Sequence, residues 1–218
     1  MRDYLPDESW LKSLRGRFIV FEGPDGSGKT TQFRRLITAL QRTGIPVCEV
    51  REPGGTLVGG DIRKILLDQA HIAMSLRCEM LLYMASRAQL VEQVIRPAMG
   101  RGEAVIADRF FPSTLAYQGA AGGLPTDEIM AVADVALHGL RPDLILVFDV
   151  DEVTAASRLN PLLDRMESKG REFHRKVRQG YLDQVAEHPE MYRRIDASLS
   201  EEQVWTSVVA VLKQKFGR

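Results

Sequence analysis

One short segment, residues 23–30, constrains this chain more than any other part of its sequence. It reads Gly-Pro-Asp-Gly-Ser-Gly-Lys-Thr and fits the pattern G-x-x-x-x-G-K-[ST] at every fixed position. Glycines let backbone N–H groups curl around phosphate oxygens, and a helix that begins beside them points its positive end at the same anion. An apolar run of strand length, residues 18–21, precedes the segment, and a helical pattern follows it. This context favours a nucleotide-phosphate loop over a chance glycine-rich turn.

Two side chains at the end of this loop carry the chemistry that the pattern predicts. We expect Lys29 to reach the β and γ phosphates of a nucleotide, and the Thr30 hydroxyl to ligate Mg²⁺. The predicted cofactor is therefore Mg²⁺, which neutralises charge on the phosphates that are separated.

Short apolar runs recur along the chain and predict the strands of one sheet. They lie at residues 18–21, 47–50, 104–107 and 144–150, with a weaker run at 191–195. Segments of helical period separate them, and parallel strands need such crossovers, which then cover both faces of the sheet. The predicted fold class is α/β: a doubly wound, five-stranded parallel sheet flanked by helices, of the P-loop NTPase type.

Local stop and start signals set the limits of several helices. A first helix is expected over residues 28–43, with Gly44 as its stop, and a long one over 76–99, with Pro97 near its end. A capped start at Thr126 and a stop at Gly139 bound a third helix, and a last amphipathic helix spans residues 201–216.

Size and composition limit the classes of protein that remain. The chain has 218 residues, 44% of them hydrophobic, which suits one well-buried domain over residues 17–218. For the extension over residues 1–16 the sequence favours flexibility over a small docking segment around Trp10.

Lys and Arg together number 29, as do Asp and Glu, so no overall positive field exists to hold a nucleic acid polymer. No apolar run has signal-peptide or membrane-span length, and Cys48 and Cys78 form no metal-spaced pair, so a cytoplasmic protein without a membrane partner is predicted.

Charged residues follow two of the predicted strands. Asp108 and Arg109 end the run at 104–107, and Arg51 begins the turn Arg-Glu-Pro-Gly-Gly-Thr at 51–56. Ligands of open α/β sheets gather at the carboxyl ends of strands, where an aspartate can hold magnesium through water and an arginine can grip phosphate. The alternatives are an Asp–Arg salt bridge that caps the strand and an incidental arginine in a surface turn.

A possible base-binding face lies further along the chain. Tyr83 and Arg87 are four residues apart and share one face of the long helix, so a ring and a guanidinium can project together. Core-edge packing is the alternative. Ser113, Thr114 and Tyr117 open the next helix with the same two interpretations.

With these residues assembled, the sequence resembles the thymidylate kinase family of P-loop nucleoside monophosphate kinases. The phosphate loop and the turn at 51–56 are followed, in the family's order, by Asp-Arg-Phe at 108–110, Ala-Tyr-Gln-Gly at 116–119, Arg-Pro-Asp-Leu at 141–144 and Asp-Arg-Met-Glu at 164–167. The likeness runs from about residue 17 to the C-terminus.

The resemblance implies an ATP-dependent kinase that converts thymidine monophosphate to the diphosphate and is a homodimer. The residues implied to bind ATP are Gly23, Pro24, Asp25, Gly26, Ser27, Gly28, Lys29, Thr30 and Thr31. Those implied to bind the acceptor nucleotide are Asp25, Arg51, Tyr83, Arg87, Arg109, Ser113, Thr114 and Tyr117. Thymine would stack on Tyr83 and bond Arg87, the monophosphate would meet Arg51 and Arg109, and Tyr117 would crowd the 2′ carbon. Thr30, Asp108 and Glu167 are the implied metal residues.

The sequence departs from the family in one place, a lid over residues 158–170. The family takes a transition-state arginine from the phosphate loop or from this lid, and here the loop carries Gly26 instead. The lid is short and weakly basic, which leaves Arg158 and Arg165 to join Lys29, Arg109 and Asp108 as catalytic candidates. For Arg165, a structural salt bridge is the alternative.

Two other classes of function remain open. One is a kinase for another deoxynucleoside monophosphate or for a nucleoside, although Arg51 and Arg109 suit an acceptor that already carries phosphate. The other is a nucleotide-binding regulatory protein with weak turnover, which the thin lid favours.

Overall fold

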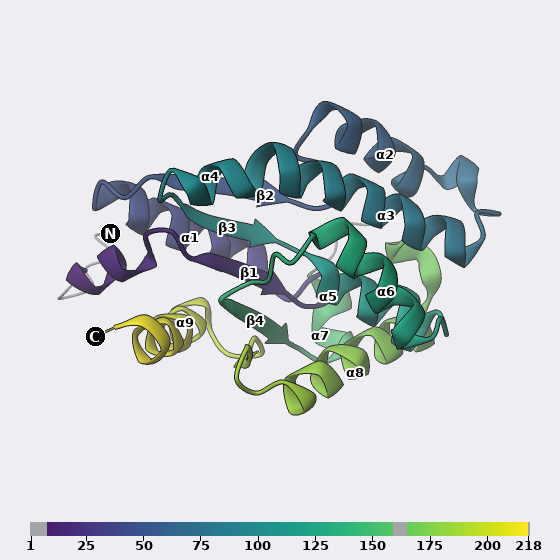
Figure 1. The fold of residues 1–218 in the computed structure, drawn as a ribbon. Coiled ribbons are helices and arrows are strands. Elements are labelled where there is room, and N and C mark those ends of the chain that lie inside the picture. The colour runs from purple at the N-terminus through teal and green to yellow at the C-terminus, as the bar shows by residue number, and fades with distance from the viewer. Residues whose placement is uncertain (1–7, 159–164, 218) are drawn as a thin grey trace.

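Five strands form one parallel sheet at the centre of the computed structural model, which describes residues 8–158 and 165–217 (Figure 1). The strands are β1 Phe18–Glu22, β2 Val47–Arg51, β3 Ala104–Asp108, β4 Leu144–Asp149 and β5 Tyr192–Asp196. Their order across the sheet is β2-β3-β1-β4-β5, and every neighbouring pair is parallel. The predicted fold class and each of the five predicted strands are confirmed.

Successive side chains of the central strands alternate between two hydrophobic cores. In β1, Phe18 and Val20 belong to one core, whereas Ile19 and Phe21 belong to the other. Both sets are buried, because helices cover both faces of the sheet. This two-sided burial explains why the central strands β1, β3 and β4 are continuous apolar runs rather than alternating patterns.

The helices divide between these two faces. One core gathers residues of α3, α6 and α8, and the other gathers residues of α1 and α9. The α-helices are α1 Lys29–Arg42, α2 Leu57–Leu67, α3 Leu76–Leu90, α4 Arg96–Gly100, α5 Phe111–Thr114, α6 Thr126–Leu137, α7 Glu152–Ser157, α8 Arg171–Glu187 and α9 Glu201–Phe216. Shorter helical turns lie at η1 Ser9–Leu14, η2 Gln69–His71, η3 Val91–Ile95, η4 Leu115–Ala121 and η5 Glu167–Lys169. Across the described ranges, no helix is long and apolar enough to cross a bilayer.

Most predicted helix limits hold to within a residue or two. The helix expected over residues 76–99 is instead interrupted: α3 passes into the π-helical turn η3 before α4 begins. Pro97 stands at the start of α4, and a proline, which lacks an N–H donor, breaks the regular i to i−4 bonding of a helix. Helices α2 and α8 are not among the helices whose limits the sequence predicts.

The N-terminal extension, predicted to be flexible over residues 1–16, is described by the structure only from residue 8. Residues 1–7 lie outside the described part, but Ser9–Leu14 form the 3-10 helix η1. Its residues Trp10, Leu11 and Leu14 are buried in the core that α9 also enters. For η1 the alternative prediction, a small segment that docks around Trp10, describes the structure better.

Candidate active site

The phosphate loop joins β1 to α1 and requires glycine at specific positions. Gly23 and Gly26 have φ angles of 139° and 77°, values that residues with a Cβ rarely adopt. A Cβ on Gly26 would lie 2.2 Å from the carbonyl oxygen of Ala155. The backbone at Ala155 therefore leaves no room for a side chain at position 26. Helix α1 begins directly after Gly28. Its free N–H groups and positive end therefore point into the loop, as anion binding requires.

Three charged side chains meet at the base of this loop. The Lys29 ammonium lies 3.7 Å from Asp108 Oδ1 and 3.9 Å from Asp25 Oδ1. Burial and the nearby Arg109 guanidinium lower the pKa of Lys29, and the carboxylates of Asp108, Asp25 and Glu22 oppose that shift. The lysine is thus buried among carboxylates whose charge it balances.

The oxygen atoms at the foot of the phosphate loop suit a magnesium ion that is bound together with nucleotide phosphates. Asp108 Oδ1 and Ser27 Oγ are buried oxygens without a hydrogen-bond partner in the described part of the chain. Oxygen is the ligand atom that Mg²⁺ prefers, and the ion commonly takes only one or two protein ligands beside water and phosphate. No cluster of three His, Cys, Asp or Glu side chains exists within the described residues, so an all-protein metal cage is not present there.

Arg109 stands where β3 gives way to α5, in an unusual backbone conformation. Its φ is 74°, in the left-handed region, where a residue with a Cβ costs about 1–3 kcal/mol. Its Nη2 donates to Asp25 Oδ1 at 2.7 Å and to the Tyr117 hydroxyl at 3.2 Å. The guanidinium therefore reaches from the carboxyl edge of the sheet to the phosphate loop, which joins the two halves of the predicted site.

Opposite charges shift the ionisation of Asp25 strongly. Burial raises the pKa of this carboxyl, but the charges of Arg109 and Lys29, with hydrogen bonds from Arg109 and Tyr117, outweigh burial and hold it well below its ordinary value. Asp25 is therefore ionised at every pH at which the protein would work.

Arg87 is fixed by a buried ion pair on the other side of the pocket. Its Nη2 lies 2.5 Å from Glu52 Oε2, its Nε donates to the same oxygen at 2.8 Å, and its Nη1 donates to Thr114 Oγ1 at 3.1 Å. Both charged side chains are almost fully buried. Burial raises the pKa of Glu52 to about 7, while the Arg87 charge and hydrogen bonds act to lower it. Much of the donor capacity of Arg87 is thus used within the protein.

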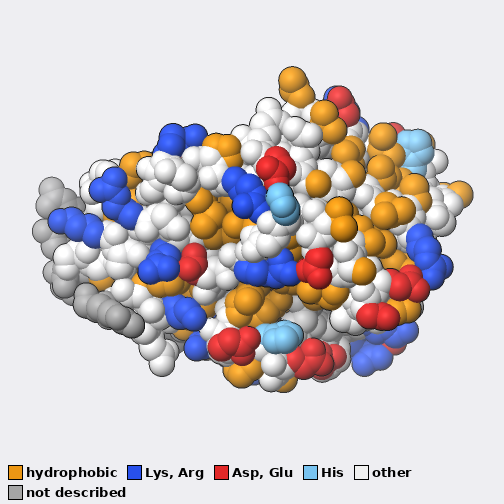
Figure 2. Space-filling model, viewed as in Figure 1, with side chains coloured by type: hydrophobic (Ala, Val, Ile, Leu, Met, Phe, Trp, Pro, Cys, Tyr) orange, Lys and Arg blue, Asp and Glu red, His pale blue; other side chains and the backbone are white. Residues whose placement is uncertain are grey.

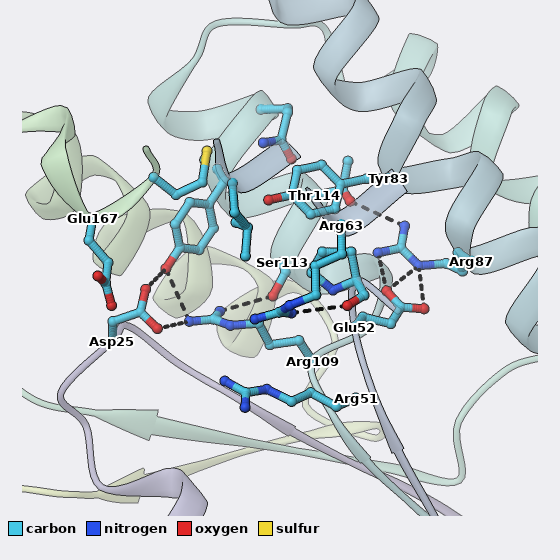
Figure 3. A pocket seen from close by; sticks show the side chains of 15 residues that line it. Asp25, Arg51, Glu52, Arg63, Tyr83, Arg87, Arg109, Ser113, Thr114 and Glu167 are labelled. Atoms are coloured by element: carbon cyan, nitrogen blue, oxygen red, sulfur yellow. Dashed lines mark hydrogen bonds and ion pairs between the residues drawn. The ribbon is translucent and has the colours of Figure 1, made fainter. Parts of the chain in front are cut away.

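One pocket collects all eight residues that the sequence predicts to bind the acceptor, and Figure 3 shows its lining side chains. They are Asp25, Arg51, Tyr83, Arg87, Arg109, Ser113, Thr114 and Tyr117, and the predicted metal residue Glu167 also lines the pocket. Arg51 is mostly exposed, and its Nε lies 3.6 Å from Asp108 Oδ2. The guanidinium groups of Arg51 and Arg109 extend toward the Asp25 end of the pocket, where Glu167 also lies (Figure 3). The predicted anion-gripping arginines and the phosphate loop therefore share one edge of the sheet.

The two lid arginines have different surroundings. Arg158 donates from Nη1 to the carbonyl oxygen of Ala197 at 3.1 Å, and the same nitrogen lies 4.0 Å from the Cβ position of Gly28. Arg165 is buried, with Nη1 2.6 Å from Glu79 Oε2 and Nε bonded to the carbonyl oxygen of Leu66 at 2.7 Å. Of the two interpretations of Arg165, these contacts favour the structural salt bridge. Residues 159–164 of the predicted lid lie outside the described residues.

Several residues at the site have no predicted role. Glu22 and Tyr181 lie beneath Arg109, Glu52 pairs with Arg87, and Arg63 lines the pocket from α2. Glu22 could have been predicted as a site residue, because a charged residue directly after an apolar strand lies at the carboxyl edge of the sheet. Tyr181 and Arg63 lie on helices whose limits the sequence does not predict, so no pattern assigns them to the site.

Comparison with known proteins agrees with this geometry. The sequence model of the thymidylate kinase family matches residues 21–208. A thymidylate kinase of Exiguobacterium sp. is 44% identical over 198 residues, which are 90% of this chain and 93% of the relative. A thymidylate kinase of Symbiobacterium thermophilum is 43% identical over 202 residues, or 92% and 94% of the two chains. The crystal structure of thymidylate kinase from Ehrlichia chaffeensis has a TM-score of 0.76 and 30% identity, and the match covers 91% of this chain and 99% of that one. The chain belongs to the thymidylate kinase family.

Proposed function

We propose that this protein transfers the γ-phosphoryl group of ATP to thymidine monophosphate. The contact between Arg109 and Asp25, at 2.7 Å, is the observation that carries the proposal, because it joins an anion-gripping arginine to the phosphate loop. Phosphoryl transfer needs its two phosphates brought end to end, and this contact marks where they would meet. Family membership supports thymidine monophosphate as the acceptor.

ATP would lie in the phosphate loop, with its phosphates against the N-terminus of α1 and the Lys29 ammonium. Magnesium bound with ATP would neutralise part of the phosphate charge. Thr30 and, through water, Asp108 are the residues that would hold it, with Glu167 as a further candidate at the Asp25 end of the pocket. The buried Asp108 Oδ1 supports this assignment, because it has no hydrogen-bond partner in the described part of the chain.

The acceptor would lie in the pocket, with its phosphate toward Arg51 and Arg109 and its base toward Tyr83 and Arg87. An oxygen of the acceptor phosphate attacks the γ phosphorus in line, one new P–O bond forms, and the bond to the leaving ADP oxygen breaks. The protein aligns the two phosphates and balances their negative charge with guanidinium and ammonium groups. We assign the transition-state arginine to Arg158, since Arg165 is paired with Glu79.

The homodimer and a cytoplasmic location are part of the same proposal. The large hydrophobic side chains that are exposed include several on α2, on α3 and between them, namely Leu57, Val58, Ile65, Ile72 and Leu81. Figure 2 shows hydrophobic side chains gathered over this region of the molecule. Contiguous exposed apolar patches mark interaction sites, and a second copy of this chain is the partner that family membership supports.

A substrate panel tests the activity directly. Purified protein with Mg-ATP is offered thymidine, uridine, cytidine and guanosine monophosphates, their deoxy forms, and thymidine itself, and ADP release is measured. We expect the highest kcat/KM with thymidine monophosphate and no turnover of the nucleoside. Lys29→Ala is expected to abolish transfer while the folded state is retained. A preference for another acceptor, or no transfer at all, would contradict the proposal.

A further inference from the structure

A buried carboxylate lies directly beneath Arg109. Glu22 ends β1 and has 0% exposure. Its Oε1 accepts the backbone N–H of Phe110 at 2.7 Å, and its Oε2 accepts the hydroxyls of Ser113 at 2.7 Å and Tyr181 at 2.8 Å. Residues from β1, α5 and α8, up to 159 positions apart in sequence, thus converge on one carboxylate.

The direction of these hydrogen bonds determines what the two hydroxyls offer to Arg109. Glu22 Oε2 accepts from both hydroxyls, so Ser113 and Tyr181 each direct their single hydroxyl hydrogen toward Glu22. Their lone pairs then face the Arg109 Nη1, which donates to Ser113 Oγ at 3.1 Å and to the Tyr181 hydroxyl at 3.0 Å. The two hydroxyls are 2.9 Å apart and form one compact cluster with Glu22.

The cluster and the arginine depend on each other electrostatically. Burial raises the pKa of Glu22, whereas the Arg109 charge and the hydrogen bonds from Ser113, Phe110 and Tyr181 lower it. Burial dominates, so the pKa of Glu22 lies above its ordinary value, and the Arg109 charge and the three hydrogen bonds limit that rise.

From this geometry we propose that Glu22 and Tyr181 are positioning residues that fix the Arg109 guanidinium for the acceptor phosphate. The inference rests on the proposed function. The Arg109 Nη2 is held by Asp25 and Tyr117, and the Nη1 is held by the Glu22 cluster, so contacts on both nitrogens define the plane of the guanidinium. Without the Tyr181 hydroxyl, the Arg109 Nη1 would lose one of its two acceptors, and the guanidinium plane would be free to rotate.

Tyr181→Phe tests this role because it removes only the hydroxyl. A hydrogen bond to a charged group is worth enough that we expect kcat/KM for thymidine monophosphate to fall about tenfold. The KM for ATP should change little, since Tyr181 has no contact with the phosphate loop among the described interactions. Tyr192→Phe is the matched control: it also removes a buried tyrosine hydroxyl, one that donates to Gln184 at 3.2 Å and has no contact with Arg109 among the described interactions.

Glu22→Gln is the second variant, and the double variant measures coupling. An amide cannot accept from both hydroxyls and from the Phe110 N–H at once, so a loss in the same parameter is expected. Because Glu22 acts through Tyr181, the double variant should lose much less than the product of the two single effects. Melting temperatures of all variants are measured in parallel.

The outcomes separate this inference from the proposed function. A wild-type protein without thymidine monophosphate kinase activity would overturn both. An active wild type with Tyr181→Phe no different from Tyr192→Phe in kcat/KM for the acceptor would overturn the inference alone. So would equal losses toward ATP and acceptor that merely follow the fall in melting temperature.

Discussion

Arg158 and Arg165 stand at the two ends of the same segment, yet only one of them is available to a bound nucleotide. Arg158 lies near Gly28 of the phosphate loop and donates a hydrogen bond to the backbone carbonyl of Ala197. Arg165 neutralises Glu79, which also accepts Gln118 Nε2 at 2.7 Å and lies 3.2 Å from Lys169. Without Arg165, this buried carboxylate would lose its closest charge partner and keep only Lys169 and Gln118, which is costly.

We therefore expect opposite signatures from two alanine variants. Arg158→Ala should lower kcat for phosphoryl transfer by 10-fold or more, roughly the effect of losing one transition-state contact, with little change in stability. Arg165→Ala should instead lower the free energy of unfolding by about 3 kcal/mol. Steady-state kinetics and urea denaturation of both proteins check this pair. Loss of kcat in Arg165→Ala without loss of stability would reverse the assignment.

A second residue-scale prediction concerns pH and Asp149, at the end of β4. Arg178 Nε lies 2.6 Å from its Oδ1, and Arg194 Nη2 lies 2.6 Å from its Oδ2. Burial raises the pKa of Asp149, but the hydrogen bonds from these two arginines outweigh burial and hold it below its ordinary value of 3.8. A lowered pKa means that this stabilisation is complete above pH 3.8 and is lost as the pH falls through the folded value.

Asp149→Asn should accordingly lower the free energy of unfolding by about 3 kcal/mol at pH 7, and the gap to wild type should narrow below pH 4. Urea denaturation at several pH values measures both quantities. Asp61→Asn is the control, because its ion pair with Lys64 is exposed on both sides. For that variant a change within about 0.5 kcal/mol is expected. A gap for Asp149→Asn that stays constant down to pH 3 would contradict the pKa argument.

At the scale of elements, close packing of α8 against η4 brings Tyr181 to the site. Gly180 makes this approach possible, since a Cβ there would lie 2.5 Å from the Cβ of Ala120. Neither atom belongs to a flexible side-chain end, so a larger residue must move the helix. The position of Tyr181 therefore depends on the absence of a side chain at its neighbour.

Gly180→Ala should destabilise the fold by about 1–3 kcal/mol despite the better helix propensity of alanine. It should also raise the KM for thymidine monophosphate, because α8 carries Tyr181. Gly100→Ala, in a helix position with no atom within 4 Å of the new Cβ, is the control and should change stability by less than about 0.5 kcal/mol. Thermal melts and acceptor kinetics are the measurements. A Gly180→Ala protein as stable as wild type would contradict this argument, because it would show that α8 and η4 can accommodate a Cβ between them.

The elements that the sequence predicts are those with strong local signals. The central strands β1, β3 and β4 are continuous apolar runs, and α1, α6 and α9 have clear starts or stops. Helix α2 contains Gly59 and Gly60, which oppose helix formation locally, and tertiary contact overrides them: a Cβ on Gly59 would lie 2.9 Å from the Gly54 carbonyl oxygen. The sequence motif and the family resemblance predict the phosphate loop and the pocket residues. They do not predict the buried residues that contact Arg109 from below. Glu22 meets Tyr181 only after the chain has folded, so no spacing in the sequence records that contact.

At the scale of the whole molecule, the exposed hydrophobic side chains of α2 and α3 predict self-association. Leu57 is 91% exposed and Leu81 51% exposed, values that burial against a second copy would reduce. Leu81→Glu should shift the protein toward a monomer in analytical ultracentrifugation, because burying an unpaired carboxylate in an apolar interface is costly. Val153→Glu changes a side chain of similar exposure on α7 and should leave the association state unchanged. A wild-type protein that sediments as a monomer at micromolar concentration would refute the dimer.

The docked helix η1 affects where the chain can be shortened. Family matching begins at residue 21, so the preceding residues look dispensable by alignment. Yet η1 contributes three buried side chains to the core that α9 also enters, namely Trp10, Leu11 and Leu14. The Lys213 ammonium of α9 lies 5.7 Å from the centre of the Trp10 ring. A protein trimmed to the aligned region would lose η1 and the buried start of β1, residues 18–20, and would expose the remaining core to water. It would keep every residue of the candidate site and still be prone to aggregate.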